Sequence, residues 1–172
     1  NLNVSIQKDQ DQIDDLLDQI KKLGGKPNTS SSDKKIIIKE LSKQLDALNV
    51  KNVLQDKNKN IIKDENINNI KVRFQKISDL SPKDLRKLVD EGKNYLKEGI
   101  VIVCASKDDK VGLAIGVTNS LTNNYDAVQL VKVGSEIIGG KGGGGRKDFA
   151  QAGGNKVEMI DEAFKKIRTL IK

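Results

Sequence analysis

Eight of the chain's fifteen glycines lie between residues 139 and 154, and three basic side chains lie among them. This stretch, GGKGGGGRKDFAQAGG, is called the glycine segment below, and its cations are Lys141, Arg146 and Lys147. Consecutive glycine N–H groups can converge on an anion, and flanking cations strengthen the attraction for phosphate. Glycine also lets a nucleic-acid backbone or an exposed base pair approach the peptide closely. The competing interpretation is a mobile surface excursion, and composition alone does not choose between the two.

Two phosphate-binding motifs of nucleotide cofactor sites do not fit the glycine segment. Residues 140–145 formally match G-x-G-x-x-G, but the preceding residues have a helical pattern and no helix opens immediately afterwards. A P-loop requires Ser or Thr after its Lys, whereas Gly142 follows Lys141. A general anion nest, or a surface on which a ligand meets bare backbone, remains the functional interpretation.

Other residues with chemical potential favour structural roles. Phe149 could stack on a base, but a single Phe in a small domain more often belongs to the core. Arg146 and Asp148 could simply pair with each other. Cys104 lies in the apolar run at 100–105, where a buried, inert thiol is the ordinary outcome.

The chain has no histidine and one cysteine among its 172 residues. A histidine-based catalytic triad is therefore excluded, and the donor set argues against a zinc site. We predict no catalytic residue and no metal site in this segment. A single cysteine also excludes a disulfide framework and fits a reducing cytosol, so we expect a cytoplasmic location.

Net charge, the lengths of the apolar runs and the first residue limit the partners that we expect. The formal net charge is +7, which permits an anionic partner, but the excess is spread over both halves rather than gathered in a tail. No apolar run reaches transmembrane length and no signal-peptide pattern opens the chain, so no membrane contact is expected. The first residue is Asn1 rather than Met, which suggests a piece of a longer protein.

The amino-terminal third has the pattern of two amphipathic helices. The first carries apolar residues at helical spacing from Ile13 to Leu23, and the second runs from about Lys34 into the fifties. The connection between them is polar, with Ser32 or Asp33 as the expected cap of the second helix. A short connection predicts an antiparallel helical hairpin, which packs either on its own globular domain or on a second copy.

The remainder alternates helix and strand patterns and predicts a small α/β domain with a mixed sheet. Residues 55–69 suggest a loop or an edge segment. Ser81, Pro82 and Asp84 form a helix-start signal, and residues 155–158 resemble a capping box. The other expected elements are a strand from about 70, strands at 100–105 and 111–118 joined as a hairpin, a helix at 126–138 and a final helix after 155.

The glycine segment closely resembles the glycine signature near the carboxy-terminal end of bacterial alanyl-tRNA synthetases. The resemblance continues upstream, because Gly116-Val117-Thr118 followed by Leu121-Thr122 is similar to the family's GVTKDLT. It covers nearly the whole chain, including the amino-terminal helices. Two departures are a fourth glycine before Arg146 and Lys147 in the place where the family usually has proline.

The resemblance implies an α+β or α/β fold made of a helical part and a DHH-associated globular part, together called C-Ala. The helical hairpin is then expected at 1–60, and the globular domain at 61–172 with a glycine-rich loop at 139–154. It further implies that the segment binds the outer corner of tRNA(Ala), helps the enzyme to dimerise and is not itself catalytic. The partners implied are tRNA(Ala), a second copy through the helical part, and the rest of the parent synthetase.

The resemblance places the parent's chemistry outside this segment. The parent would attach alanine to tRNA(Ala) with ATP and magnesium and would edit mischarged tRNA with zinc, whereas the segment itself would hold no cofactor. The tRNA-binding residues implied are those of the glycine segment: Gly139, Gly140, Lys141, Gly142, Gly143, Gly144, Gly145, Arg146, Lys147, Phe149 and Gln151.

Two other functions compete with this interpretation. DHH-family phosphoesterases carry a related nucleic-acid-binding domain with a glycine-rich motif, but their motif is typically followed by a histidine, which this chain lacks. A purely structural dimerisation module would explain the apolar helical stripes. It would leave the glycine and charge cluster without a role.

Overall fold

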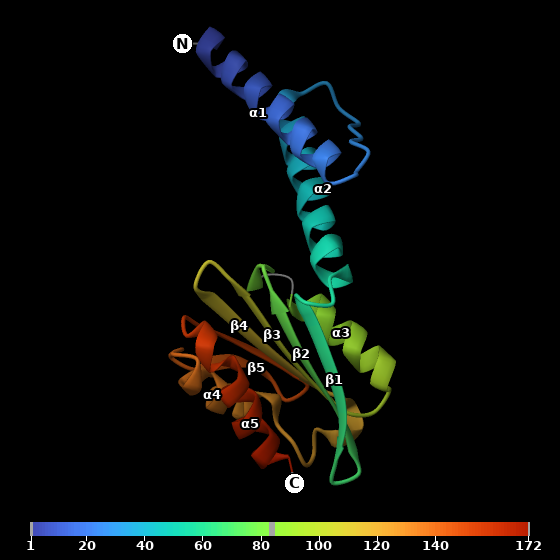
Figure 1. Ribbon diagram of the computed structural model, residues 1–172, viewed down its shortest axis with the longest axis vertical. Coiled ribbons are helices and arrows are strands. Elements are labelled where there is room, and N and C mark those ends of the chain that lie inside the picture. Colours follow the sequence, from blue (N-terminus) through green and yellow to red (C-terminus); the bar gives the residue numbers. More distant parts are fainter. Residues whose placement is uncertain (1, 83–84, 172) are drawn as a thin grey trace. The chain divides into compact units, whose positions relative to one another are not determined.

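The computed structural model describes residues 2–82 and 85–171 and divides the chain into two compact units (Figure 1). Unit 1 comprises residues 1–55 and unit 2 residues 56–172, so the boundary precedes the expected one at residue 60. No helix among the described residues is long and apolar enough to cross a lipid bilayer.

Unit 1 consists of two helices, α1 (Leu2–Lys22) and α2 (Lys34–Gln55). As the apolar spacing predicts, Ile13, Leu16 and Ile20 pack against Leu41 in a small core. The backbone N–H of Lys35 donates to the Asp33 carboxylate at 2.9 Å, as expected of a residue that caps α2.

The two helices of unit 1 run in the same direction, not as the predicted antiparallel hairpin (Figure 1). Gly25 lies against the side chain of Leu48, Asn28 is hydrogen-bonded to Gln44, and Ser30 is hydrogen-bonded to Glu40. The connection therefore runs backwards along α2 from its second half to its start. Eleven residues separate the helices. Since an extended residue covers about 3.3 Å and a helical one 1.5 Å, that length is ample for the return.

Unit 2 is a six-stranded mixed sheet with strand order β1-β2-β3-β4-β6-β5. Strands β2 and β3 are parallel and every other neighbouring pair is antiparallel. The elements are β1 (Asn60–Ile67), β2 (Ile70–Ser78), α3 (Leu85–Leu96), β3 (Ile100–Lys107), β4 (Lys110–Val117), the short 3-10 turn η2 (Asn119–Leu121), α4 (Ala127–Ile137), β5 (Gly143–Arg146), β6 (Phe149–Gly154), the 3-10 turn η3 (Val157–Met159) and α5 (Ile160–Leu170).

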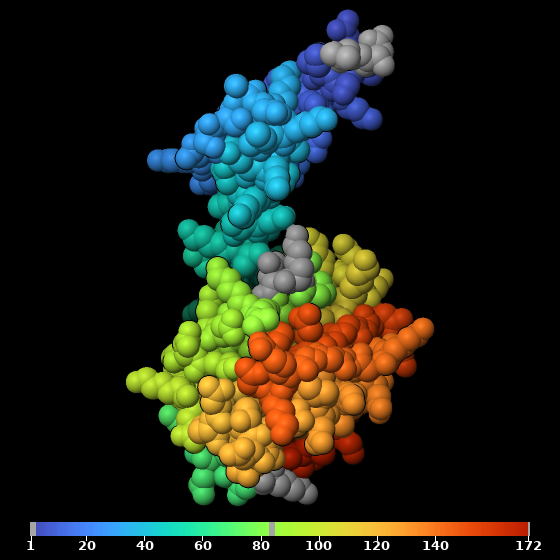
Figure 2. All heavy atoms as spheres, turned by 180° about the vertical axis from the view of Figure 1, so that it is seen from behind, coloured from blue at the N-terminus to red at the C-terminus, as the bar shows by residue number. Residues whose placement is uncertain are grey.

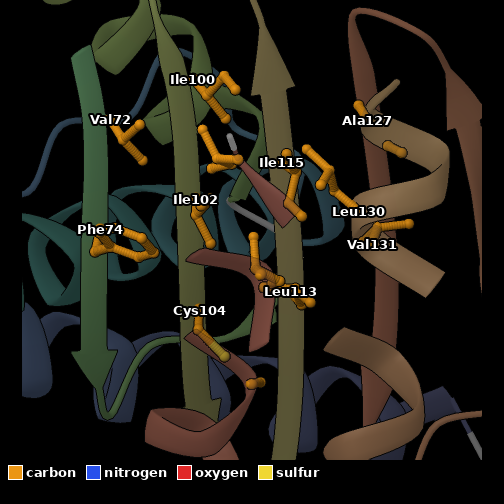
Figure 3. Packing of buried hydrophobic residues seen from close by; sticks show 14 of the residues in the cluster. Val72, Phe74, Ile100, Ile102, Cys104, Leu113, Ile115, Ala127, Leu130 and Val131 are labelled. Carbon is orange, nitrogen blue, oxygen red and sulfur yellow. The ribbon is translucent and has the colours of Figure 1, made fainter. Parts of the chain in front are cut away.

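Helices cover both faces of the sheet. On one face, alternate residues of β2, β3 and β4 form the main core with α4 and α5, and Figure 3 shows Val72, Ile102 and Leu113 on neighbouring strands with Val131 on the helix next to Leu113. Cys104 belongs to this core, so the expectation of a buried thiol is confirmed, and its burial raises the pKa of the thiol to about 12. On the opposite face, α3 lies over the β3–β4 hairpin.

Small residues on β4 let α3 approach the sheet closely. A side chain at Gly112 would meet Leu85, and a side chain at Gly116 would meet Val89. The predicted strands of this central hairpin and the helix at 126–138 are confirmed, and Asp126 caps α4 by accepting a hydrogen bond from the N–H of Val128.

The structure corrects or completes four local expectations. Residues 60–67 form β1, the edge-strand alternative for 55–69. The predicted capping box is wrong, because a 3-10 turn precedes α5 and Met159 holds its N-cap position. Of the helix-start signal, residues 83 and 84 lie outside the described part of the chain. The glycine segment is not a loop: most of it forms β5 and β6.

Candidate functional site

The glycine segment folds as a hairpin of two strands, β5 and β6, called the glycine hairpin (residues 143–154) below. Strand β6 pairs with β4, which places β5 at an edge of the sheet. Gly139 has a φ of 82° after the end of α4, a left-handed conformation that suits glycine. An extended, paired strand is not a nest of converging N–H groups, so the predicted anion nest is not present at β5.

Most glycines of the segment are required by packing or by a left-handed backbone conformation. A Cβ at Gly140 would collide with the backbone carbonyl of Gly153 and with the Ser135 hydroxyl. A Cβ at Gly143 would lie 2.7 Å from the Cβ of Ala152, because β5 packs closely against β6 and α4 at this position. The density of glycine therefore has a structural cause at these positions, independent of any ligand.

Gly144 and Gly153 lack such a cause. A Cβ at Gly144 would have no neighbour within 4 Å, and one at Gly153 would have its nearest neighbour at 3.7 Å. Neither residue has a φ in the left-handed region. Among the fifteen glycines, all within the described ranges, these two alone have neither a steric nor a conformational requirement.

These two glycines lie on one exposed face of the hairpin. Gly144 is opposite Gln151 in the β5–β6 pair, and Gly153 is two residues further along β6, so all three residues share a face. Gly153 is also opposite Gly112, which α3 covers, so this is the face of the sheet on which α3 lies. All three are exposed, and Figure 2 shows the orange-red hairpin beside the yellow-green helix. We call Gly144, Gln151 and Gly153 the bare platform.

Cations from two elements border the bare platform. Arg146 is exposed and lies 3.8 Å from the Asp148 carboxylate, a weak pairing that leaves its side chain 72% accessible. From α3, the Arg86 guanidinium lies 5.1 Å from the centre of the Phe149 ring, in the range of a cation–π contact. The Lys93 ammonium donates to the backbone carbonyl of Asp148 at 3.3 Å. Phe149 is thus a half-buried anchor between α3 and the hairpin.

Two functional candidates on α3 escaped the sequence-based prediction. Arg86 and Lys93 are seven residues apart, two helical turns, so they share one side of α3. The sequence shows that spacing, but nothing in it indicates that this side of the helix faces the glycine hairpin. The structure thereby joins α3 to the hairpin in one basic surface.

Ser135 also escaped prediction. It is fully buried on α4, its carbonyl accepts the N–H of Gly140 at 2.7 Å, and its hydroxyl accepts the N–H of Gly142 at 3.2 Å. These two bonds fix the chain as it leaves the helix and enters β5.

The predicted site residues divide into three groups. Gly144, Arg146, Phe149 and Gln151 share the platform face; Gly143 and Gly145 pair with Ala152 and Ala150, which belong to the opposite, core face. Lys141 and Lys147 are exposed on either side of β5. Gly139, Gly140 and Gly142 shape the exit from α4. Contact of any of them with tRNA stays a prediction.

Comparison with known proteins identifies close relatives of unit 2. The family profile of the DHHA1 domain matches residues 69–172. An alanine–tRNA ligase of Parvibaculum lavamentivorans is 47% identical over 103 residues, which are 59% of this chain and 12% of that enzyme. An alanine–tRNA ligase of Hyphomonas neptunium is 42% identical over 106 residues, 62% of this chain and again 12% of the enzyme. The chain thus matches a small part of the length of these enzymes.

A solved structure agrees with these sequence relatives. The crystal structure of the C-Ala domain from Aquifex aeolicus alanyl-tRNA synthetase superimposes with a TM-score of 0.60 and 28% identity, covering 63% of this chain and 97% of that domain. The resemblance inferred from the glycine signature and the α+β fold class are both confirmed.

Proposed function

The chain belongs to the DHHA1 domain family, and from this membership we propose that it is the carboxy-terminal part of an alanine–tRNA ligase that binds the outer corner of tRNA(Ala). In this proposal the chain holds tRNA and performs no chemistry. Activation of alanine with ATP and magnesium, and zinc-dependent editing, belong to the rest of a cytoplasmic parent enzyme.

The bare platform is the observation that carries this proposal. Gly144 and Gly153 expose backbone that packing does not require to be bare, with the amide of Gln151 between them. A flat peptide surface suits a flat partner, such as the outward face of a base pair at a corner of a folded RNA. Arg86 and Arg146 at its border supply attraction for the adjoining phosphates.

A double substitution tests the role of the hairpin cations. We expect Lys141→Ala with Arg146→Ala to weaken binding of tRNA(Ala) by about tenfold, because two phosphate-facing charges are lost. The measurement is a titration of labelled tRNA followed by gel shift or fluorescence anisotropy. Lys21→Ala with Lys22→Ala, which removes two exposed charges in unit 1, is the matched control. Equal affinity of the hairpin variant and the parent protein would refute this assignment.

Self-association through unit 1 is a second proposed function. Val4 is 64% exposed and Ile6 and Ile36 are each 47% exposed, so the helical unit presents apolar surface that its own core does not use. A second copy would cover this surface. Sedimentation equilibrium should show a dimer that Val4→Ser with Ile6→Ser converts to monomer; a monomer at high concentration of the unaltered protein would contradict the proposal.

A further inference from the structure

Unit 2 contains a polar recess that the glycine hairpin does not form. It has a volume of about 780 Å³ and lies between the β1–β2 turn, the segment after η2, the first turn of α4 and the end of α5. Four carboxamide side chains line it: Asn68, Asn123, Asn124 and Gln129. We call this recess the carboxamide pocket. Its volume lies within the range of sites for small organic ligands, about 300–1,000 Å³.

The lining selects against a phosphate ligand. The chain has 31 lysines and arginines, yet none of the described residues that line the carboxamide pocket is basic. Its charged member is Asp126, one oxygen of which accepts the N–H of Val128 at 2.9 Å. An anion would find repulsion here, so the recess suits an uncharged ligand.

The carboxamides select a ligand with mixed hydrogen-bonding edges. Each Asn or Gln amide presents two donor hydrogens and one acceptor oxygen. Nucleobases carry donors and acceptors side by side on their edges, and Asn and Gln are the side chains that pair with adenine in bidentate fashion. Four such amides therefore offer partners to a base edge in more than one orientation.

Besides the carboxamides and Asp126, the lining consists of aliphatic side chains and Tyr125. Leu121 and Leu130 are buried in the core, whereas Leu170, in the last turn of α5, keeps 42% of its surface exposed. Leu170 is one of the large apolar residues of unit 2 that the core leaves uncovered. A planar ring lying against it would bury that surface while its edge met the amides.

The pocket is held in shape and joined to the glycine hairpin. The backbone N–H groups of Asn124 and Tyr125 both donate to the carbonyl of Leu121, at 3.0 and 2.9 Å, which fixes the segment that carries two of the amides. The next bond along this segment runs from the N–H of Ala127 to the carbonyl of Lys147 at 3.0 Å. Asp126, which lines the pocket, is therefore the neighbour of Ala127, whose N–H is bonded to the turn between β5 and β6.

We propose that the carboxamide pocket binds an unpaired nucleobase of the RNA that lies on the glycine hairpin. This inference rests on the proposed function, because the hairpin brings the RNA to the pocket. Single-stranded bases are commonly recognised in this way, splayed from the RNA and bonded through their edges.

Side-chain amide signals test the pocket directly. In two-dimensional ¹H–¹⁵N spectra of the 172-residue chain, each of adenosine, guanosine, cytidine and uridine is titrated to millimolar concentration. We expect one of the four to shift the amide signals of Asn68, Asn124 and Gln129 in a saturable manner. If none of the four shifts these signals, or if the shifts map elsewhere on the protein, the inference is overturned.

A double variant then asks whether the base comes from RNA. Asn124→Ala with Gln129→Ala removes two amides at exposed positions, and Asn94→Ala removes an exposed amide of α3 outside the pocket. We expect the double variant to lose the nucleoside-induced shifts and to bind tRNA(Ala) about five- to tenfold more weakly, while Asn94→Ala matches the parent protein. Unchanged tRNA affinity of the double variant would overturn the inference.

The same titrations separate this inference from the proposed function. The Lys141→Ala, Arg146→Ala variant should lose tRNA affinity but keep the nucleoside-induced shifts, since neither residue lines the pocket. If that variant binds tRNA normally while the Asn124→Ala, Gln129→Ala variant does not, the assignment of Lys141 and Arg146 to phosphate binding fails and the pocket stands.

Discussion

At the scale of single residues, the glycines of the glycine segment have different structural roles although they are the same residue type. The sequence predicts a concentration of glycine beside cations, but it cannot say which glycines the fold requires. That distinction depends on what lies next to each glycine, and the neighbours of the packed glycines come from α4, β6 and the residues just after β6. Gly143 and Gly144 are adjacent in sequence, yet one faces packed side chains and the other faces solvent. The site was therefore predictable as a segment and not as a surface.

These adjacent glycines give a matched pair of substitutions. Gly143→Ala should destabilise unit 2 by about 1–3 kcal/mol, because its methyl group would lie 2.7 Å from the Cβ of Ala152. Gly144→Ala should leave stability within about 0.5 kcal/mol and weaken tRNA binding about fivefold, because its methyl group projects from the bare platform. Urea unfolding and tRNA titration measure the two effects. Equal loss of stability in both variants would contradict the structural distinction.

Ser135 should act on binding through the position of β5. Ser135→Ala removes the acceptor of the Gly142 N–H, so we expect faster hydrogen exchange at Gly142 and about threefold weaker tRNA binding. A purely structural role would lower the melting temperature without selective exchange at the hairpin. Thr122→Ala, which removes an exposed local hydrogen bond elsewhere in unit 2, is the control and should leave exchange in the hairpin unchanged.

At the scale of elements, the existence of helices and strands followed from the sequence better than their directions. The apolar stripes of α1 and α2 lie in the core of unit 1 as their spacing predicts. Their relative direction depends on the path of the connection, which carries no periodic signal. The sequence predicts only that the polar residues Asn28 and Ser30 belong to a connection. In the structure they are hydrogen-bonded to Gln44 and Glu40 on α2. The glycine hairpin was likewise hidden, since glycine has little preference for strand.

The connection in unit 1 should depend on the charge of Glu40. The Ser30 hydroxyl donates to this carboxylate, as does the N–H of Ser30 at 3.0 Å, and the two bonds, the hydroxyl first, lower the pKa of Glu40. Because the pKa is lowered, the ionised Glu40 side chain stabilises the folded connection at pH values above the ordinary Glu pKa. This contribution is lost as the pH falls through the lowered pKa. The amide signal of Ser30 should therefore titrate below the ordinary Glu range, and Glu40→Gln should abolish the titration. A midpoint at or above the ordinary Glu pKa would contradict the contact.

At the scale of the whole molecule, the chain is two cores joined at residues 55 and 56. Among the described residues, the core cluster of unit 1 has four buried side chains, whereas the main core of unit 2 has nineteen. Because the apolar surface removed from water sets most of the stability, unit 2 holds most of it. The sequence predicted a helical part and an α/β part because the spacing of the apolar residues changes between them.

The division predicts that unit 2 is independent. A fragment of residues 56–172 should fold with unchanged amide signals for its core strands and should bind tRNA(Ala) with the affinity of the whole chain, if the hairpin carries the binding. Its affinity should fall steeply with salt, in a linear relation between the logarithms of the two, because released counterions drive phosphate contacts. A fragment that folds but binds weakly would instead assign tRNA contacts to unit 1.

The open side of Gly144 and Gly153 bears on how such a domain can evolve. Since neither glycine has a steric or conformational requirement, we expect selection to act on a substitution there through the partner that touches it. One codon change could remove the proposed RNA binding and leave an intact, stable domain free to acquire another partner. At Gly140 or Gly143, by contrast, loss of the fold would eliminate the variant first. The face of the hairpin that contributes least to stability is thus the one on which function can drift.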